Sequence, residues 1–352
     1  NWGQRFVWME HAQWQGYPLS DMIFPTFLFC VGMSMSISFH KKESQRQIYF
    51  QWFKKVVKRT LLLILIGLLL NGFPSYDLTN LRFPGVLLRI ALCYFIVANL
   101  WVFLKYCKAK NTEFYLLLIS AIILVLYDML RYYVPVSDMG ITGDAPNSSW
   151  PVILDQKIFG VNHLWSYGLF EGKVTYDPEG LLSTLPACFN VILGFVIGVF
   201  YEKKRNLYSL QFLFCLVITL LIIVLVLDYY AIVPSIKKIW TSSFALLSGG
   251  FSLVIFVFIR ILGASVQTTK YILYPKLVYG SNAILAFIIS TLLTSIFDMP
   301  IGDTSIRKAG YQFYTLFIPD QKWSSFLFSL TFLLLLFIGL NYLYQMEIFL
   351  KV

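Results

Sequence analysis

Long apolar runs, separated by short clusters of charge, are the feature that most constrains the fold of this chain. We count about nine runs that are long enough to cross, as helices, a hydrocarbon core of about 30 Å. Helices are expected because a segment that spans a bilayer must satisfy its own backbone hydrogen bonds. The sequence therefore predicts an all-α fold, a polytopic membrane helix bundle. The expected spans cover residues 20–39, 56–70, 84–104, 114–130, 177–201, 207–229, 240–261, 275–297 and 324–344.

The composition agrees with a bilayer as the solvent. Hydrophobic residues make up 58% of the 352 residues and charged residues only 13%. A water-soluble domain of this length needs more charge to cover its surface. The net charge of +10 would suit a nucleic-acid partner. However, the charges lie between the apolar runs, as membrane topology requires, so we expect membrane lipids as partners and no nucleic acid.

Lysine and arginine predict the orientation of the chain. They are concentrated in alternate loops and span ends, at residues 41–59, 105–110, 203–205 and 260–276. The positive-inside rule makes these regions cytoplasmic and places residues 1–19 outside. The first visible span then runs from outside to inside, in a chain that starts without Met or a signal peptide. We therefore expect one further helix before it, giving about ten spans in all.

No linker, low-complexity tract or convincing repeat divides the sequence, so residues 1–352 are expected to form a single domain. Its largest outer loop covers residues 131–175, and a loop that long suits a lid, a binding surface or a plug on the helix ends. The five cysteines are scattered and lie outside the outer loops, so they predict neither a disulfide framework nor a metal site. A homo-oligomer is compatible with the sequence, because helix faces toward lipid and toward a partner look alike.

His11 stands in an aromatic-rich segment just before the first span, with Trp14 three residues later. Near pH 7 a neutral imidazole takes a proton from an amine or carries an acyl group. The alternative is an interfacial residue within an aromatic belt. Ser20 or Asp21 is expected to cap the helix that follows.

Charged residues at the outer ends of two other spans are further candidates. Asp177 is expected to cap the fifth span, where Glu179 would complement the helix dipole. They serve only as a helix start, or one of them holds a substrate amine or hydroxyl near His11. Arg89 lies about 8 Å inside the third span, at roughly 1.5 Å per residue. There it either faces a partner or a wet cavity, or snorkels to the outer interface.

A basic run marks the cytoplasmic end of the second span, and its members are Lys54, Lys55, Lys58 and Arg59. Such clusters serve topology and bind anionic lipid. Alternatively, this run holds the phosphates of a nucleotide-bearing donor from the cytosol.

Several of these stretches resemble the heparan-alpha-glucosaminide N-acetyltransferase family and its bacterial relatives, the transmembrane acyltransferases. The matching pieces are HAQWQGYPLSDMIFPTFLFCVG, LRFPGVLLRIALCYF, NHLW with YDPEGLLSTL, and GSNAIL. The most specific is the pattern H-x-x-W-x-G-x-x-x-x-D-x-x-F-P, which begins at His11. The resemblance implies that His11 is the active-site histidine and that His163 matches the histidine of the loop before YDPEG. Asn1 resembles the asparagine that precedes the active-site histidine, although this sequence is one residue shorter between them.

The function that this resemblance implies is a transmembrane acetyltransferase. Acetyl-CoA would be the acyl donor on the cytosolic side, with its phosphates at the basic run, and an amino sugar on the outer side would be the acceptor. Trp14, His163, Asp177, Glu179 and Arg89 would bind the acceptor. Because the large lumenal domain of the animal enzymes is absent from the sequence, we expect a bacterial inner-membrane protein with His11 on the periplasmic side. The main alternative is an amino-sugar transporter, and a third is a binding or scaffolding membrane protein.

Overall fold

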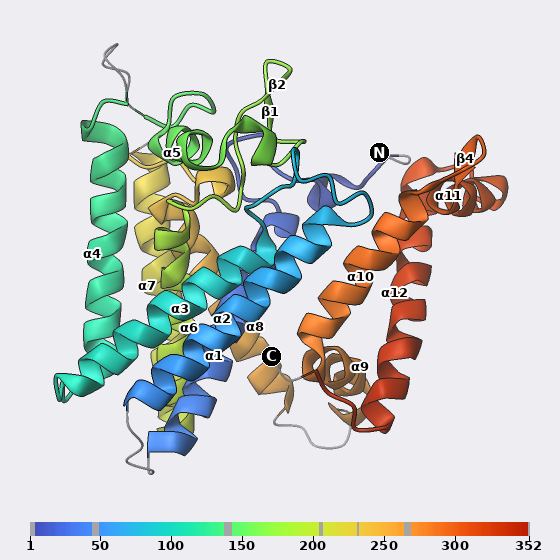
Figure 1. Cartoon of the computed structure of the whole chain (residues 1–352). Coiled ribbons are helices and arrows are strands. Elements are labelled where there is room, and N and C mark those ends of the chain that lie inside the picture. Colours follow the sequence, from blue (N-terminus) through green and yellow to red (C-terminus); the bar gives the residue numbers. More distant parts are fainter. Residues whose placement is uncertain are drawn as a thin grey trace. The chain divides into compact units, whose positions relative to one another are not determined.

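The computed structural model describes residues 4–43, 49–136, 143–203, 207–230, 232–263 and 269–350. These residues are mostly helical (Figure 1), so the prediction of an all-α membrane protein is confirmed. The α-helices are α1 (Ile23–Glu43), α2 (Tyr49–Gly72), α3 (Val86–Tyr106), α4 (Thr112–Tyr133), α5 (Trp150–Phe159), α6 (Thr184–Lys203), α7 (Leu207–Tyr229), α8 (Ser242–Gly263), α9 (Thr269–Ser281), α10 (Ala283–Asp298), α11 (Ile306–Phe317) and α12 (Gln321–Gln345).

Six helices of the described residues are long and apolar enough to cross a membrane, and α9 with α10 makes a seventh if the two are counted as one bent span. The six are Leu19–Phe39, Val86–Tyr106, Thr112–Tyr133, Thr184–Tyr201, Ser242–Ile261 and Gln321–Gln345. The two other expected spans coincide with α2, whose first half carries the basic run, and with α7. The count of nine spans stays a prediction.

The expected span at 275–297 is wrong as a continuous helix, because α9 and α10 meet at an angle of 82°. Asn282 lies at the break, with φ −128° and ψ 38°. Its side-chain amide donates to Ile348 O at 2.9 Å and accepts from Leu350 N at 3.0 Å. An asparagine that bonds to distant backbone competes with the helix ladder, and the preceding Gly280 has low helix propensity. The GSN run therefore breaks the span and ties it to the chain after α12.

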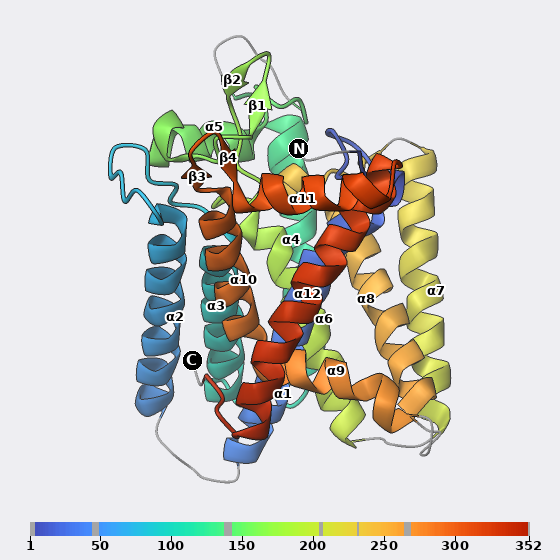
Figure 2. The same cartoon turned by 90° about the vertical axis from the view of Figure 1, so that its right-hand side faces the viewer.

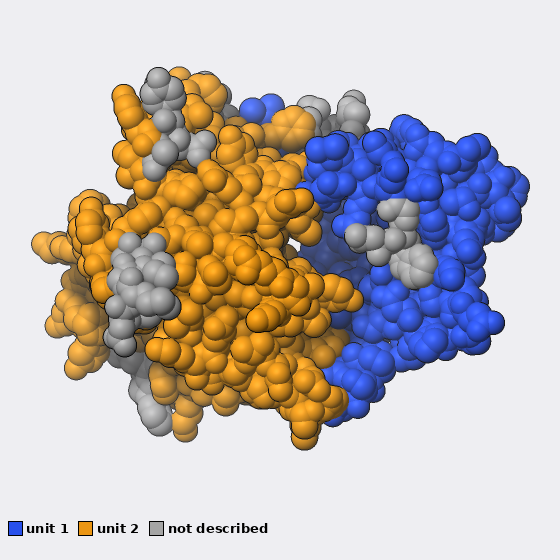
Figure 3. Space-filling model, turned by 90° about the horizontal axis from the view of Figure 1, so that it is seen from above, with its two compact units in different colours: residues 1–10, 72–76, 259–352 blue, residues 11–71, 77–258 orange. Residues whose placement is uncertain are grey.

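The chain divides into two compact units, coloured separately in Figure 3. Unit 1 comprises Asn1–Glu10, Gly72–Tyr76 and Ile259–Val352, and it contains α9 to α12. Unit 2 comprises His11–Asn71 and Asp77–Phe258, and it contains His11 and the segment between α4 and α6. The expectation of a single domain over residues 1–352 stays a prediction.

The core of unit 2 is built around α6, which packs most closely against α1 and also contacts α3 and α4. Glycines allow the close approach of α1 and α6. A Cβ on Gly32 would lie 1.9 Å from Val191 O, and a Cβ on Gly194 would lie 2.0 Å from Phe29 O. Small residues at such contacts let helix backbones approach within a membrane. The α1–α6 pair therefore provides a rigid base for the segment that precedes α1.

The expected outer loop at 131–175 is partly regular. α4 extends to Tyr133, and α5 and the 3-10 helix Val161–His163 follow. A hairpin of β1 (Leu169–Phe170) and β2 (Lys173–Val174) then leads toward α6. Figure 1 shows α5 and this hairpin gathered at one end of the helices of unit 2. The candidate site lies at this end.

Candidate functional site

His11 lies in the irregular segment before the 3-10 helix η2 (Leu19–Met22). Two backbone features turn this segment back over unit 2. Gly16 has φ +130°, which favours glycine, and its N–H donates to Ser235 O at 2.9 Å. The chain can therefore pass His11 across the end of the helices without a regular element of its own.

The expected role of Asp21 as a helix cap is wrong. Asp21 lies within η2, and its carboxylate turns back toward the preceding segment. Oδ1 lies 2.6 Å from His11 Nδ1, and Oδ2 accepts from Ala12 N at 3.1 Å. A cap would bind the first N–H groups of the following helix, but here the backbone of an earlier residue and an imidazole take both oxygens.

This pairing defines which ring nitrogen of His11 is available for chemistry. A carboxylate only accepts hydrogen bonds, so Nδ1 carries a proton in this pair, and in the neutral form of the ring Nε2 is the nitrogen with the lone pair. The His11 side chain is 59% exposed, whereas that of Asp21 is 2% exposed. A buried carboxylate that orients an accessible imidazole is the arrangement found in hydrolytic triads. His11 is thus positioned to act as a base or nucleophile through Nε2.

Lys237 completes the group from a distant part of the chain. Its Nζ donates to Asp21 Oδ1 at 2.8 Å, from the 3-10 helix η4 (Lys237–Ile239) between α7 and α8. The ammonium balances the buried carboxylate, so Asp21 stays ionised without being exposed to water. The contact of Asp21 with both His11 and Lys237 was not predicted from the sequence.

An aromatic surface adjoins this group. The rings of Trp14 and Tyr176 meet edge to face with centroids 5.1 Å apart, and Trp14 Nε1 donates to Asp144 O at 2.8 Å. Lys238 Nζ lies 4.9 Å from the Tyr176 ring centroid and bonds to Gln13 O. Burial lowers the pKa of Lys238. Trp14, a predicted acceptor-binding residue, therefore lies where an aromatic pair already holds a cation.

The expected helix start at Asp177 is also wrong, because α6 begins at Thr184 and residues 177–183 are not helical. Asp177 Oδ1 accepts from Glu179 N at 3.0 Å and so caps a turn rather than a helix. Gly180 interrupts the run of helix formers. The YDPEG motif is thus a loop that lies before the N-terminal end of α6.

Arg82 binds both carboxylates of this loop. Its Nε and Nη2 donate to the two oxygens of Asp177 at 2.8 and 2.6 Å, and Nη2 also pairs with Glu179. Burial opposes the charge on Arg82, yet the hydrogen bond and charge of Asp177, with those of Glu179, raise its pKa. Asn71, near the end of α2, positions Arg82 by donating to the Arg82 carbonyl at 3.0 Å. A substrate amine at Asp177 or Glu179 would have to compete with Arg82.

Arg89 holds the same loop from inside. It is fully buried, so it does not snorkel. Its Nη2 donates to Gly180 O at 3.0 Å and to the Ser183 hydroxyl, and its guanidinium lies 4.9 Å from the Trp240 ring centroid. Arg89 thus contacts this loop and an aromatic ring, whereas its role in binding the acceptor stays a prediction.

Asp155 of α5 holds the loop from the other side. Its Oδ1 accepts from Leu181 N at 2.8 Å, and the side chain is packed against Gly180, where an added Cβ would lie 1.7 Å from Oδ2. Burial raises the pKa of Asp155 to about 7. Gly180 is therefore required by the close approach of this carboxyl group.

His163 lies next to the Arg82 segment. Its Nδ1 is 2.7 Å from Leu81 O, which can only accept, so Nδ1 carries a proton. The ring stacks on Phe83 with centroids 4.2 Å apart. The structure brings His163, Arg82 and Asp177 to one end of unit 2. The role of His163 in binding the acceptor stays a prediction.

Polar side chains continue into the apolar interior beneath Trp240. Its Nε1 donates to Asn190 Oδ1 at 3.3 Å, and Asn190 Nδ2 donates to the Ser248 hydroxyl at 3.1 Å. Further along α8, the Ser252 hydroxyl donates to Thr26 Oγ1 at 3.1 Å. Polar side chains within a membrane helix bundle usually face its interior rather than lipid, and they often belong to functional sites.

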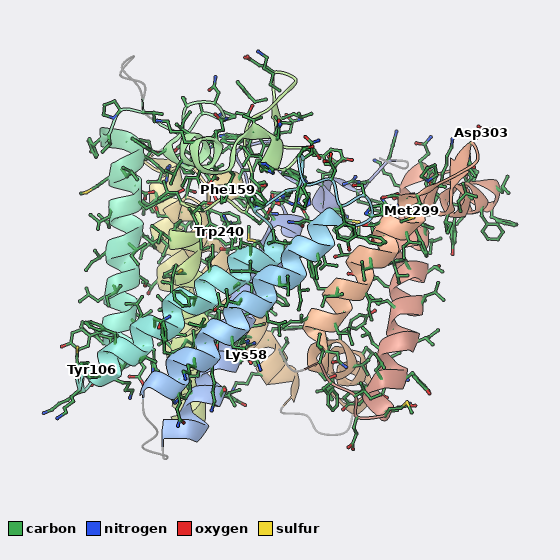
Figure 4. All side chains as sticks on the ribbon, viewed as in Figure 1. Lys58, Tyr106, Phe159, Trp240, Met299 and Asp303 are labelled. Atoms are coloured by element: carbon green, nitrogen blue, oxygen red, sulfur yellow. The ribbon has the colours of Figure 1, made fainter. Side chains whose placement is uncertain are left out.

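The basic run lies elsewhere. Lys54, Lys55, Lys58 and Arg59 recur at helical spacing on one face of α2. The three lysines are exposed, and the Arg59 guanidinium lies 4.6 Å from the Tyr94 ring centroid. In Figure 4, Lys58 lies far from Trp240 and from Phe159 of α5, toward the opposite end of the helices. Asn1, the other predicted catalytic residue, lies outside the described residues.

Comparison with known proteins gives this arrangement a context. No family model matches the chain. It is 26% identical over 331 residues to the heparan-alpha-glucosaminide N-acetyltransferase of Homo sapiens, covering 81% of this chain and 49% of that protein. It is 27% identical over 340 residues to the protein of the same name from Mus musculus, covering 84% of this chain and 51% of that protein. The chain spans about half the length of the curated relatives it matches. It is an integral membrane protein and a distant relative of the heparan-alpha-glucosaminide N-acetyltransferases.

Proposed function

We propose that this chain is a transmembrane acetyltransferase that moves an acetyl group from cytosolic acetyl-CoA to the amine of an amino sugar on the outer side. The single observation that carries the proposal is the geometry of His11. Its Nδ1 is 2.6 Å from a buried carboxylate of Asp21, and this leaves Nε2 accessible. The names of its two relatives supply the reaction class.

Two routes use the same nitrogen. In direct transfer, His11 Nε2 takes a proton from the acceptor amine as the amine nitrogen attacks the thioester carbonyl. The C–S bond then breaks, and the thiolate leaves with that proton. In the two-step route, Nε2 attacks the carbonyl carbon, the C–S bond breaks, and CoA leaves as the thiolate. The amine nitrogen then attacks the acetyl-imidazole, the bond between the acetyl carbon and Nε2 breaks, and the amine proton passes to the thiolate or to solvent. Asp21 stabilises the positive imidazole in both routes.

The donor and the acceptor are assigned to different ends of unit 2. The basic run of α2 would hold the phosphates of acetyl-CoA, because exposed lysines on one helix face suit a polyanion. The acceptor would bind at the His11 end, against the rings of Trp14 and Tyr176 and near His163. Asp177, Glu179 and Arg89 would shape this end by fixing the YDPEG loop. The membrane is proposed to be a bacterial inner membrane, with His11 on the periplasmic side.

Acetyl transfer by purified protein tests this function. The chain in proteoliposomes is incubated with radiolabelled acetyl-CoA and glucosamine, and labelled N-acetylglucosamine is measured. His11→Ala is expected to abolish transfer. Gln15→Ala, on the same exposed segment, is the matched control and is expected to retain it. Full activity of a folded His11→Ala variant would contradict the proposal.

A second candidate, an amino-sugar transporter, is favoured by one observation. Broken helices are common at transporter substrate sites, and α9 and α10 meet at 82° within one apolar stretch. A transporter would accumulate labelled glucosamine in proteoliposomes without acetyl-CoA. Transfer of label to glucosamine without such uptake supports the enzyme.

A further inference from the structure

α11 is the most amphipathic helix of unit 1, and it connects two apolar helices. It follows the hairpin of β3 (Pro300–Ile301) and β4 (Thr304–Ser305) after α10, and it precedes α12. The Ser305 hydroxyl caps it by accepting from Lys308 N at 3.2 Å. Figure 2 shows α11 running crosswise to α12. At about 1.5 Å per residue its twelve residues measure roughly 18 Å, too short to cross a core of about 30 Å.

One side of α11 packs against its neighbours within unit 1. The Arg307 guanidinium pairs with Asp298 at 2.9 Å. Gly310 faces the Phe328 ring of α12, where an added Cβ would lie 2.7 Å from the ring edge. The Tyr314 hydroxyl bonds to the Thr331 hydroxyl. Arg307, Gly310 and Tyr314 are three and four residues apart, so they share one helix face.

The adjoining face of α11 is apolar and exposed. At about 100° per residue, Ile306, Ala309, Phe313, Leu316 and Phe317 fall on one arc. Phe313 is 56% exposed, Leu316 79% and Phe317 70%. The rings of Phe313 and Phe317 also contact each other, with centroids 5.2 Å apart. This arc is a contiguous apolar surface of large side chains.

The remaining arc is polar. It consists of Lys308, Tyr311, Gln312 and Thr315. α11 therefore has three sides: one packed on protein, one apolar and one polar. A helix surrounded by water would not be expected to carry the exposed apolar side, and a fully buried helix would not be expected to carry the polar side.

We propose that α11 lies in the plane of the membrane surface, with Phe313, Leu316 and Phe317 inserted among the lipids at the boundary of headgroups and acyl chains. Phospholipid, rather than protein, is the assigned partner because α11 joins two helices that meet the bilayer. α12 is a candidate span, and it exposes large apolar side chains such as Leu334 and Ile338, as a lipid-facing helix does. A short helix tied to such a span at its packed side has its apolar arc at lipid and its polar arc at water.

Photocrosslinking of the full-length chain in proteoliposomes tests this placement. The photoreactive residue p-benzoylphenylalanine is placed at position 313 or 316 of the apolar arc, or at 311 or 315 of the polar arc. Position 334 on α12 serves as the positive control for lipid contact. After irradiation, mass spectrometry of the modified peptide measures the yield of phospholipid adduct, and gel electrophoresis detects linked chains.

Positions 313 and 316 are expected to give lipid adducts at yields near that of position 334, and positions 311 and 315 at several-fold lower yields. Three results would overturn the proposal. Linked pairs of chains at 313 and 316 would assign the arc to a second copy. Adducts at 334 but not at 313 or 316 would place the arc in water. Equal adducts at all four α11 positions would show that the helix has no fixed orientation at the surface.

Discussion

Replacing Asp21 by asparagine tests the positioning of His11 most directly. The substituted side chain would keep the shape of the original, but it would lack the negative charge and offer an amide N–H to the imidazole. A hydrogen bond to a charged group contributes about 1.5–3 kcal/mol, and each 1.36 kcal/mol is tenfold in rate. Losing the 2.6 Å contact between His11 Nδ1 and Asp21 is therefore expected to lower kcat about 10- to 100-fold. A wrong tautomer of His11 would lower it further.

The same change also affects stability, because Lys237 Nζ would lose its partner at 2.8 Å. Breaking a buried ion pair on one side costs about 3–5 kcal/mol. The 16% exposure of the Lys237 side chain favours the lower end of that range. The double variant Asp21→Asn with Lys237→Gln removes both charges, so it is expected to recover most of the thermal stability while kcat stays low.

The assay measures initial rates of acetyl transfer against the concentrations of donor and acceptor, together with thermal unfolding. A positioning role predicts a lower kcat with little change in the KM for acetyl-CoA, because Asp21 contacts His11 and not the proposed donor site. A folded Asp21→Asn variant with the kcat of the unmodified protein would refute the reasoning. So would a double variant that recovers activity together with stability, since Asp21 would then act only through the fold.

Three further changes test the surroundings of the site. Arg82→Met leaves two carboxylates without their cation and is expected to destabilise the protein by about 3 kcal/mol; an unchanged unfolding temperature would contradict this. Because the folded pKa of Asp155 is raised to about 7 from about 3.9 in unfolded chains, its charged form is disfavoured in the fold. Stability should thus decrease by up to about 4 kcal/mol from pH 4 to pH 7. Asp155→Asn should flatten that slope in unfolding experiments, and an unchanged slope would argue against it. Gly194→Ala places a Cβ 2.0 Å from Phe29 O and is expected to cost about 1–3 kcal/mol, whereas Gly339→Ala meets nothing within 4 Å and should be neutral; equal effects in the two would contradict the packing argument.

The spans were predictable because apolar length alone identifies a helix that can cross a bilayer. Their ends and breaks were not. Asp177 with Pro178 has the composition of a helix start, yet Arg82, Arg89 and Asp155 hold that stretch as a loop, and all three come from other parts of the chain. Such long-range contacts outweigh local propensity.

In the candidate site, too, the residues of a local motif could be predicted, whereas their long-range partners could not. His11 was identified by a motif with local spacing, and Asp21 belongs to that motif, although its local context indicated a helix cap. Lys237 lies 216 residues away from Asp21, in a loop with no motif of its own. Arg82 precedes Pro84 in a stretch whose composition is typical of the start of a span. A single sequence reveals neighbours along the chain, but the partners of a buried carboxylate depend on the fold.

The ion pair between Asp21 and Lys237 has a consequence for biosynthesis. Ribosomes add about 5–20 residues per second, so about 10 to 40 seconds separate the synthesis of these two residues, 216 positions apart. During that interval a nascent chain already carries its histidine but lacks the cation that steadies the carboxylate beside it. If His11 acts as proposed, acetyl transfer is therefore expected to reach its full rate only after the loop before α8 has been synthesised. Incomplete chains would be expected to transfer acetyl more slowly, as would the Asp21→Asn variant.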